Sequence, residues 1–304
     1  MEQIQPEIAL VQRAGFFRET VNVFRRWPIV SIVIISILAF VAIFAPVISP
    51  QSPIESNLRD RNAPPFWYTE WYEENDKVTR TYILGADPIG RGVLSRLLHG
   101  ARISMLVVVV AMVSGTVIGT ALGLISGYAG GVVDEIITRI VDIWLGFPFI
   151  MLALIVAVTI GPGIVTMMGL LALVAWPPFV RNVRAEVLTL RERDYVALAK
   201  ISGASSSRIL MRHILPGVLN TVMVIATLRI GQLILTESFL SFLGAGIPPP
   251  TPTWGGIIAD GREYLRDAWW VSVFAGIAIG LTVLALNFFG DWMRDTFDPR
   301  LRQV

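Results

Sequence analysis

The chain contains no cysteine, and only 16% of its 304 residues are charged. Without cysteine there can be no disulfide, no thiolate nucleophile and no cysteine-ligated metal or iron–sulfur site. An ordinary soluble domain carries about 25% charged residues, well above the fraction found here. Hydrophobic residues make up 54% of the sequence, and the mean hydropathy is +0.64. The composition therefore excludes an ordinary soluble protein and indicates an all-α membrane protein.

Motifs for nucleotide hydrolysis and for common catalytic centres are also missing. Neither of the two lysines, Lys77 and Lys200, follows a glycine, so the phosphate-binding loop G-x-x-x-x-G-K-[ST] is absent. The two histidines, His99 and His213, belong to no H-E-x-x-H motif, and there is no G-x-S-x-G motif. We therefore expect a non-catalytic chain that binds no cofactor or metal itself and has no nucleic acid partner.

Long apolar segments predict six transmembrane helices. A membrane helix needs about 20 mostly apolar residues to cross roughly 30 Å of hydrocarbon. One of the apolar segments is twice this length, and the triplet Gly161-Pro162-Gly163 near its middle is typical of a tight turn that divides it into two spans. The apolar segments are Ile29–Ile48, Ile103–Gly127, Ile143–Val180, Gly217–Leu243 and Ala268–Gly290.

The distribution of arginine and lysine predicts the orientation of these spans. Basic residues are retained preferentially on the cytoplasmic side, and they are more numerous there if both chain ends lie inside. This N-in and C-in topology makes residues 49–102 external and the segment Asp194–Pro216 cytoplasmic. The external segment holds an aromatic cluster suited to the membrane interface or to a partner, formed by Phe66, Trp67, Tyr68, Trp71 and Tyr72.

The stretch DYVALAKISGASSSRILMRHILP, Asp194–Pro216, predicts a helical hairpin between the fourth and fifth spans. Its first helix runs from Arg191 to Ser202 and ends at Gly203 in a left-handed conformation. A serine at 205, 206 or 207 caps the second helix, and Pro216 separates that helix from the next span. Such a hairpin either packs against its own spans or presents its small and apolar tip to another protein.

The hairpin sequence also carries a family resemblance. The hairpin resembles the EAA loop of ABC-importer permeases in the spacing of Ala199, Gly203 and the pair Leu215-Pro216. Its sequence is similar to that of the C-type subunit of the dipeptide/oligopeptide/nickel permease family. Ala197 and Leu198 replace the Glu and Ala that open the motif, and His213 replaces its Ile. Residues 49–83 match the family least. The segments that resemble its other signatures, in the expected order, are 84–104, 130–148, 235–258 and 285–302.

The resemblance implies a type I ABC-importer permease fold and a division of the chain into three parts. Residues 1–98 would form an N-terminal segment with the first span and the external loop. Residues 99–291 would form the importer transmembrane domain, with the coupling hairpin at 191–215. Residues 292–304 would form a cytoplasmic tail. Residues implied to couple to an ATPase are Tyr195, Leu198, Ala199, Gly203, Ala204, Ser205 and Pro216.

The same resemblance implies an inner-membrane subunit that provides half of a path for dipeptides or oligopeptides, or else for nickel or another small solute. Its implied partners are a homologous permease subunit, two ATPase subunits that bind ATP and Mg, an external substrate-binding protein and membrane lipid. An ion-coupled secondary transporter is the alternative class. Such a protein would more naturally carry several intramembrane acids, whereas the expected spans offer only Arg229 and Glu237.

Within the spans, a glycine stripe and two charges are candidate functional features. Gly115, Gly119, Gly123 and Gly127 recur every fourth residue, which favours a close-packing seam over a substrate path and suits a subunit built to pair. A charge at membrane depth is costly, so Arg229 and Glu237, about 12 Å apart along a helix, either fix packing or line or gate the path.

Further polar and aromatic residues lie near the ends of the spans. Trp254, in a Pro-rich and Gly-rich external loop, could shape a gate, seat a binding protein or anchor at the interface. Glu135 and Arg139 have the i, i+4 spacing of a surface ion pair beside Asp134. The cytoplasmic end of the last span is expected to be anchored by Asp291, Arg294 and Asp295.

Overall fold

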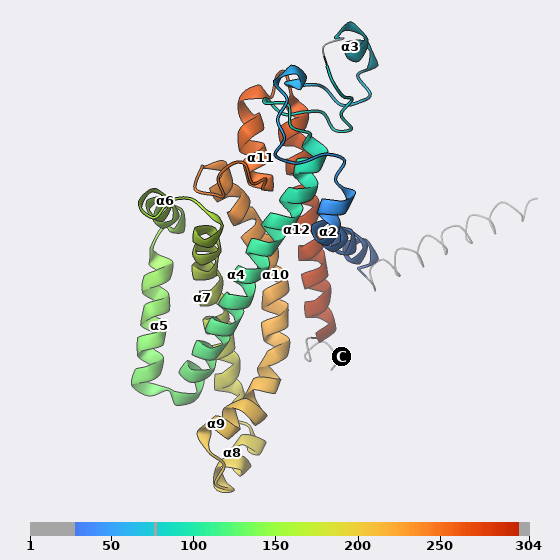
Figure 1. Cartoon of the computed structure of the whole chain (residues 1–304). Coiled ribbons are helices and arrows are strands. Elements are labelled where there is room, and N and C mark those ends of the chain that lie inside the picture. Colours follow the sequence, from blue (N-terminus) through green and yellow to red (C-terminus); the bar gives the residue numbers. More distant parts are fainter. Residues whose placement is uncertain (1–27, 76–77, 298–304) are drawn as a thin grey trace, which may run out of the picture.

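The computed structural model describes residues 28–75 and 78–297, and this part of the chain is built from helices (Figure 1). Five helical segments are long and apolar enough to cross a membrane, and a bent pair of helices makes a sixth possible span. The long helices are α2 (Ile29–Ile48), α4 (Val93–Ala129), α7 (Ile164–Leu190), α10 (Leu215–Phe242) and α12 (Trp269–Phe297). The bent pair is α5 (Gly131–Gly146) and α6 (Phe149–Thr159).

The bent pair corrects the predicted start of the third span. We expected a helix from Ile143 to the glycine turn at Gly161, but α5 begins at Gly131 and the chain bends by 80° before α6. Phe147 is extended because the residue before a proline is disfavoured in the α conformation, and Pro148 has no N–H with which to continue α5. The predicted turn between the two spans is present, with Gly161 at a φ of +99°.

The second span is also longer than its apolar segment. α4 begins at Val93 rather than Ile103 and ends at Ala129, so it has 37 residues. At 1.5 Å per residue this is about 55 Å, which exceeds the roughly 30 Å hydrocarbon thickness. Hydropathy marks only the part of a helix that lies in lipid, whereas Arg96 and Arg102 belong to the part of α4 that extends beyond it.

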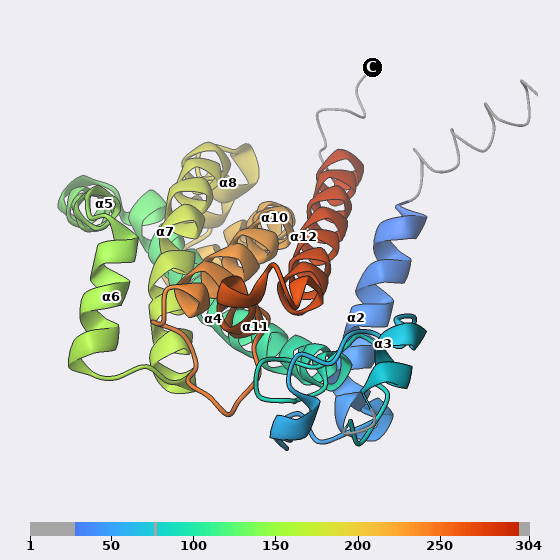
Figure 2. The ribbon, with the colours of Figure 1, turned by 90° about the horizontal axis from the view of Figure 1, so that it is seen from above.

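The core lies where α4, α7, α10 and α12 pack against one another. Viewed from above in Figure 2, α5 and α6 lie on one side of this group, and α2 lies on the opposite side against α4 and α12. α4 and α7 form the most extensive helix pair. The arrangement leaves many apolar side chains of the spans exposed, as expected for helices that face lipid or partner helices.

The two ends of the bundle carry different elements (Figure 1). One end holds the hairpin of α8 (Asp194–Ile201) and α9 (Ser206–Ile209), together with the α4–α5 connection and the end of α12. The other end holds α3 (Thr69–Glu74) and α11 (Trp254–Gly261). The basic-residue distribution makes the hairpin end cytoplasmic.

Parts of the predicted organisation fall outside the described residues or inside helices. The predicted inside location of the N-terminus and residues 298–304 of the predicted tail lie outside the described residues. The predicted domain boundaries at 98/99 and 291/292 fall within α4 and α12, so neither coincides with a break in the backbone.

Asp60 organises the external segment between α2 and α4. Its buried carboxylate accepts hydrogen bonds from the backbone N–H of Thr79 (2.8 Å), the hydroxyl of Tyr82 (2.8 Å) and the side-chain amide of Asn57 (3.1 Å). Burial opposes ionisation, but the hydrogen bonds from Thr79 and Tyr82 outweigh it and hold the pKa of Asp60 below its ordinary value of 3.8. The ionised carboxylate therefore stabilises the fold of this segment.

The external segment should loosen in acid. Because the folded pKa of Asp60 is lowered, its stabilisation is complete above the unfolded pKa of about 3.9 and is lost as the pH falls through the folded pKa. A nitroxide on a single cysteine at exposed Glu73 of α3 should therefore keep its mobility from neutral pH down to the ordinary carboxyl pKa, and should gain mobility as the pH falls through the lowered pKa of Asp60. Asp60→Asn should remove this transition, whereas Glu55→Gln, at an exposed ion pair with Arg80, should keep it. An identical acid transition in Asp60→Asn would contradict the assignment.

Candidate functional site

The cytoplasmic hairpin has the left-handed glycine and the serine cap that its sequence predicts, but its first helix, α8, begins at Asp194 rather than Arg191. α8 ends at Ile201, and Gly203 follows with a φ of +78°, a conformation that glycine adopts without the steric cost of a side chain. The N–H groups of Gly203 and Ala204 donate to the carbonyls of Lys200 and Ala199, both at 3.0 Å. The Ser205 hydroxyl caps α9 by accepting from the Arg208 N–H (3.4 Å). These interactions fix the angle between the two arms.

Pro216 does not separate the hairpin from the next span, contrary to the prediction. α9 continues through a π-helical turn, Leu210–Ile214, directly into α10. In this turn the Leu215 N–H donates to the Leu210 carbonyl, five residues back. Pro216 lies in the first turn of α10, where its fixed φ suits a helix and its missing N–H costs little. The second arm of the hairpin is therefore an extension of a membrane helix.

The hairpin has a buried base and an exposed apolar tip. Val196, Ile209 and Ile214 are at most 1% exposed, and Ala199 and Ala204 pack against the same core. Of the predicted coupling residues, Tyr195 and Leu198 lie on the surface, whereas the two alanines hold the arms together. Sequence reasoning missed Ile201 and Met211, although Ile201 follows Leu198 by three residues and so shares its face. The exposed fractions are 44% for Tyr195, 63% for Leu198, 83% for Ile201 and 64% for Met211.

Two contacts join the hairpin region to the cytoplasmic end of α4. The Arg191 guanidinium donates to the Gly127 carbonyl (3.0 Å), and the Lys200 ammonium lies 5.7 Å from the centroid of the Tyr128 ring. Both are contacts of a cation with the last turn of a helix, where the macrodipole also favours positive charge. The hairpin is thus attached to α4 as well as to its own flanking helices α7 and α10.

An ion pair near this end replaces the one predicted from sequence. No ion pair between Glu135 and Arg139 occurs in the described structure, and both side chains are exposed. Instead, Asp134 accepts two hydrogen bonds from Arg184 on α7, at 2.5 and 2.6 Å, and a third from Ser126 on α4. A bidentate contact to a neighbouring helix is geometrically stronger than an exposed i, i+4 pair. Asp134 therefore ties α5 to α7 and α4.

The glycine stripe of α4 lies against α7 of the same chain. A Cβ at Gly115 would stand 2.3 Å from the Ala175 Cβ, and one at Gly119 would stand 2.4 Å from the Trp176 carbonyl oxygen. Gly123 and Gly127 meet Val183 and Val187 in the same way, at 2.8 and 2.7 Å. The seam therefore joins two helices within one chain. The interpretation that it suits pairing between subunits is wrong for this face, since α7 already occupies it.

The three candidate path or gate residues differ in their surroundings. Arg229 on α10 is half-buried and donates to Gln232. Glu237 is fully buried and accepts from the hydroxyls of Ser104 (3.2 Å), Ser241 (2.9 Å) and Ser238 (3.4 Å). It therefore lies within the packed junction of α4 and α10 and not at a surface.

Trp254 belongs to the same junction. It is 1% exposed and its indole N–H donates to the Leu97 carbonyl (3.1 Å). Its backbone N–H lies 3.4 Å from the Ser104 hydroxyl that contacts Glu237. Interfacial anchoring by Trp254 is thus wrong, because its ring is buried against Leu97 and Gly100 of α4. In this conformation Trp254 and Glu237 fix packing rather than line an open path.

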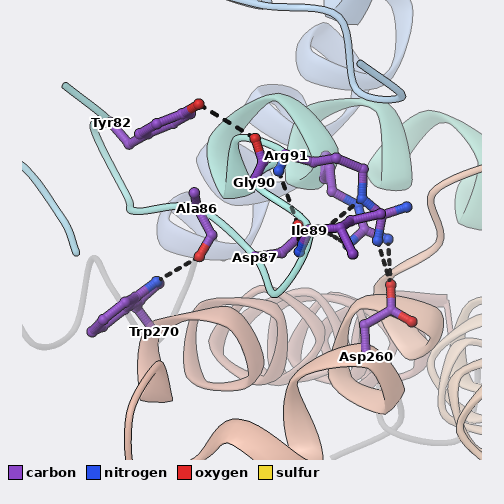
Figure 3. Close-up of polar contacts among 9 residues, drawn as sticks. Tyr82, Ala86, Asp87, Ile89, Gly90, Arg91, Asp260 and Trp270 are labelled. Carbon is purple, nitrogen blue, oxygen red and sulfur yellow. Dashed lines mark hydrogen bonds and ion pairs between the residues drawn. The ribbon is translucent and has the colours of Figure 1, made fainter. Parts of the chain in front are cut away.

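Sequence reasoning missed a polar network at the external end (Figure 3). Asp87 in the loop before α4 accepts from Arg91 Nε (2.6 Å) and Arg96 Nη1 (2.6 Å). Asp260 on α11 accepts from Arg91 Nη2 (2.9 Å) and Arg96 Nη2 (2.8 Å). Figure 3 also shows the Trp270 indole donating to the Ala86 carbonyl (3.0 Å), which docks this loop on α12. Two arginines and two aspartates are thereby brought together from the loop, α4 and α11.

Comparison with known families assigns the chain. A family model described as "Binding-protein-dependent transport system inner membrane component" matches residues 119–303, and one described as "N-terminal TM domain of oligopeptide transport permease C" matches residues 16–65. The chain belongs to this family of inner-membrane permeases. It is the C-type permease subunit that the ordered sequence segments indicated.

Curated relatives match nearly the whole permease. It is 44% identical to the dipeptide transport system permease protein DppC of Escherichia coli strain K12 over 275 residues, which cover 90% of this chain and 89% of that protein. It is 36% identical to the di/tripeptide transport system permease protein DppC of Pseudomonas aeruginosa, with 88% and 86% covered. It is 38% identical to DppC of Alkalihalophilus pseudofirmus, with 90% and 86% covered.

A solved structure supports the fold. The MetNI methionine ABC transporter in an inward-facing conformation superimposes with a TM-score of 0.53 at 22% sequence identity, covering 64% of this chain and 93% of the MetNI chain. At this identity the likeness concerns the fold alone. It agrees with the type I ABC-importer permease fold that the sequence predicted.

Three members of the external network, Asp87, Arg91 and Arg96, lie within the segment 84–104 that resembled the family, whereas Asp260 lies outside the resembling segments. The network could not be predicted from the sequence. Asp87 and Arg91 have an i, i+4 spacing that usually signals an exposed pair. Nothing in the sequence links them to Asp260, which is 169 residues after Arg91. Only the folded arrangement of α4 and α11 brings these charges together.

Proposed function

We propose that this permease is a membrane subunit of an ATP-driven importer of dipeptides or oligopeptides. The observation that carries the proposal is the 44% identity to a dipeptide permease along 90% of the chain. In this proposal the chain forms half of a translocation path and a homologous permease subunit forms the other half. An external binding protein delivers the peptide, consistent with the family's binding-protein dependence.

We further propose that the hairpin tip is the surface to which an ATPase subunit binds. Tyr195, Leu198 and Ile201 form an exposed apolar face at the cytoplasmic end, where a soluble partner could bury it. Around this face the exposed cations Arg193, Lys200 and Arg208 outnumber Asp194, and Glu192 is paired with Arg191, so a net positive charge remains that suits a groove with an acidic rim. Since the chain has no phosphate-binding loop, ATP and Mg are assigned to two partner ATPase subunits, and this chain is assigned no catalytic step.

The mechanism follows from how the hairpin is attached. ATP-driven closure of the two ATPases would displace both hairpins, and the fixed angle between α8 and α9 would pass this displacement to α7 and α10. Contacts from Arg191 and Lys200 would pass it to α4 as well. Rigid-body movement of these helices can alternate access to a site between the two permeases. Arg229, half-buried on α10, is the residue we assign to the path or its gate.

The test is reconstitution of the full complex in lipid vesicles. With the binding protein and a labelled dipeptide present, uptake should require ATP, and the loaded binding protein should raise the ATPase rate several-fold. The ligand that copurifies with the binding protein should be a peptide by mass spectrometry. Uptake by this chain alone, driven by an ion gradient without ATP, would instead support a secondary transporter. A binding protein that carries nickel and no peptide would replace the cargo but keep the ATP-driven mechanism.

A further inference from the structure

The external network holds one end of α11 to the start of α4. Within it, Asp87 is fully buried, and the side chains of Arg91 and Arg96 are 7% and 3% exposed. Asp260, at 30% exposed, is the one member on α11. A single oxygen of Asp260, Oδ2, accepts from both arginines. Two positive and two negative charges balance, so the network is neutral only while Asp260 stays in place.

The other end of α11 is also attached to α4. The Trp254 indole donates to the Leu97 carbonyl (3.1 Å), and the ring stands over Gly100, where an added Cβ would come within 3.1 Å of it. α11 is therefore fastened at both ends to α4, near Arg96 and near Gly100. α11 also packs closely on α10 at Gly255 and on α12 at Gly261, and the Ser272 hydroxyl of α12 donates to the Ile258 carbonyl (3.3 Å). Its ion pairs, however, are with Arg91 and Arg96 at the start of α4.

α4 itself reaches from this external network to the cytoplasmic hairpin. It is one continuous helix of 37 residues without an internal proline, and its last turn contacts the hairpin region through Gly127 and Tyr128. The glycine seam binds α7 closely along the middle and cytoplasmic half of α4. Helices kink at proline, at Gly/Ser pairs or at inserted side chains. α4 has no internal proline, and its two Ser-Gly pairs, Ser114-Gly115 and Ser126-Gly127, are held against α7 by the seam. A displacement at the hairpin end thus reaches the external end without an obvious point of flexure.

We propose that Asp260 is a positioning residue that makes α11 move with α4, so that the network couples this external element of the permease to the cytoplasmic hairpin. This inference rests on the proposed ATP-driven function. Burial of the two arginines and of Asp87 explains why the coupling is firm: if α11 moved alone, the arginines would be left in excess over one carboxylate in a buried site. Asp260 acts through the arginines and is not assigned any contact with cargo.

The first measurement needs no change to the network. Because the chain has no native cysteine, nitroxides can be placed at single introduced cysteines, Arg102→Cys on the exposed face of α4 and Glu263→Cys just after α11. In the reconstituted complex, the distance between the two labels should be the same without nucleotide and with ATP trapped by a hydrolysis-deficient partner ATPase. A distance that changes between these two states would show that α11 moves independently of α4 and would overturn the proposal.

The second measurement removes the charge of Asp260. Asp260→Asn should broaden the distance distribution between the labels and lower peptide uptake at least tenfold, while ATP hydrolysis continues. Asp260→Glu, which keeps a carboxylate, should restore uptake at least partly. The matched control is Glu55→Gln, which removes a carboxylate from an exposed ion pair on the same external face and should leave both readings unchanged.

Uptake and distances equal to wild type in Asp260→Asn would also overturn the proposal. If Asp260→Asn fails to assemble, the distance between labels in the unaltered network decides alone. Failure of the proposed cargo is separately visible, because wild-type complex would then take up no peptide while the label distances could still be compared between nucleotide states.

Discussion

Valine in place of Gly119 should prevent the permease from reaching its native bundle. A Cβ at this position would stand 2.4 Å from the Trp176 carbonyl oxygen and 2.6 Å from the Phe179 Cβ, and real Cβ atoms do not approach so closely. Neither neighbour is the flexible end of a side chain, so α4 and α7 would have to separate. Overpacking of a well-packed core commonly costs about 1–3 kcal/mol, and here it would open the longest interface of the fold.

The measurement is the yield and thermal unfolding of the purified permease in detergent, with and without its partners. We expect Gly119→Val to be recovered mainly as aggregate, and Gly119→Ala to be recovered with a clearly lowered melting temperature. The matched controls are Gly169→Ala in α7 and Gly280→Ala in α12, helical glycines at which an added Cβ meets nothing within 4 Å. Equal recovery of Gly119→Val and these controls would show that the seam does not determine packing.

Aspartate in place of Leu198 should abolish ATP-driven uptake while the permease still folds. Leu198 is 63% exposed at the hairpin tip, so the change does not disturb the core of this chain. If the tip is buried in a groove of the ATPase, the carboxylate would be desolvated without a partner, which costs several kcal/mol and corresponds to a loss of affinity of at least a hundredfold. Uptake and binding-protein-stimulated ATPase activity should both fall to background.

Two comparisons separate loss of docking from loss of fold. Val196→Asp, at a fully buried position in the same helix, should destabilise the hairpin itself and make it sensitive to protease. Thr189→Asp, an exposed position at the end of α7, adds the same charge away from the tip and should leave uptake near wild type. Copurification of the ATPase with Leu198→Asp at wild-type yield, with normal uptake, would show that the tip is not the docking surface.

The sequence predicted the spans well where hydrophobicity alone decides the structure. α2 has the predicted bounds, Ile29–Ile48, and α12 lies over the predicted apolar segment. Local turn chemistry was also readable, since Gly203 and Ser205 act as a left-handed helix end and an N-cap. Hydropathy failed where the backbone changes direction within apolar sequence, at Phe147-Pro148, and where helices extend beyond lipid, as α4 does.

Contacts between residues far apart in the chain could not be predicted from the sequence. The glycine spacing predicted that α4 packs closely against another helix, but it could not identify that helix. The spacing describes the surface of α4 and contains no information about its partner. Glu237 has no charged partner in the described structure, and its three serine donors come from α4 and from α10 itself. The external network joins residues from three elements. The i, i+4 spacing of Asp87 and Arg91 predicts an exposed ion pair, whereas both side chains are buried. These features depend on tertiary packing, which composition and periodicity do not encode.

The π-helical turn at Leu210–Ile214 lies directly before α10, so the number of residues in the hairpin's second arm sets how α10 is rotated about its own axis. An α-helix advances by about 100° per residue, and the π turn accommodates one more residue than an α turn would. Removing one residue here would rotate all of α10 by about a quarter turn relative to the hairpin. Glu237 would then leave Ser104 of α4, while Ser238 and Ser241 would turn with it, and a different face of α10 would turn toward α12. The fold should therefore tolerate substitutions at the hairpin tip better than insertions or deletions in the arm behind it.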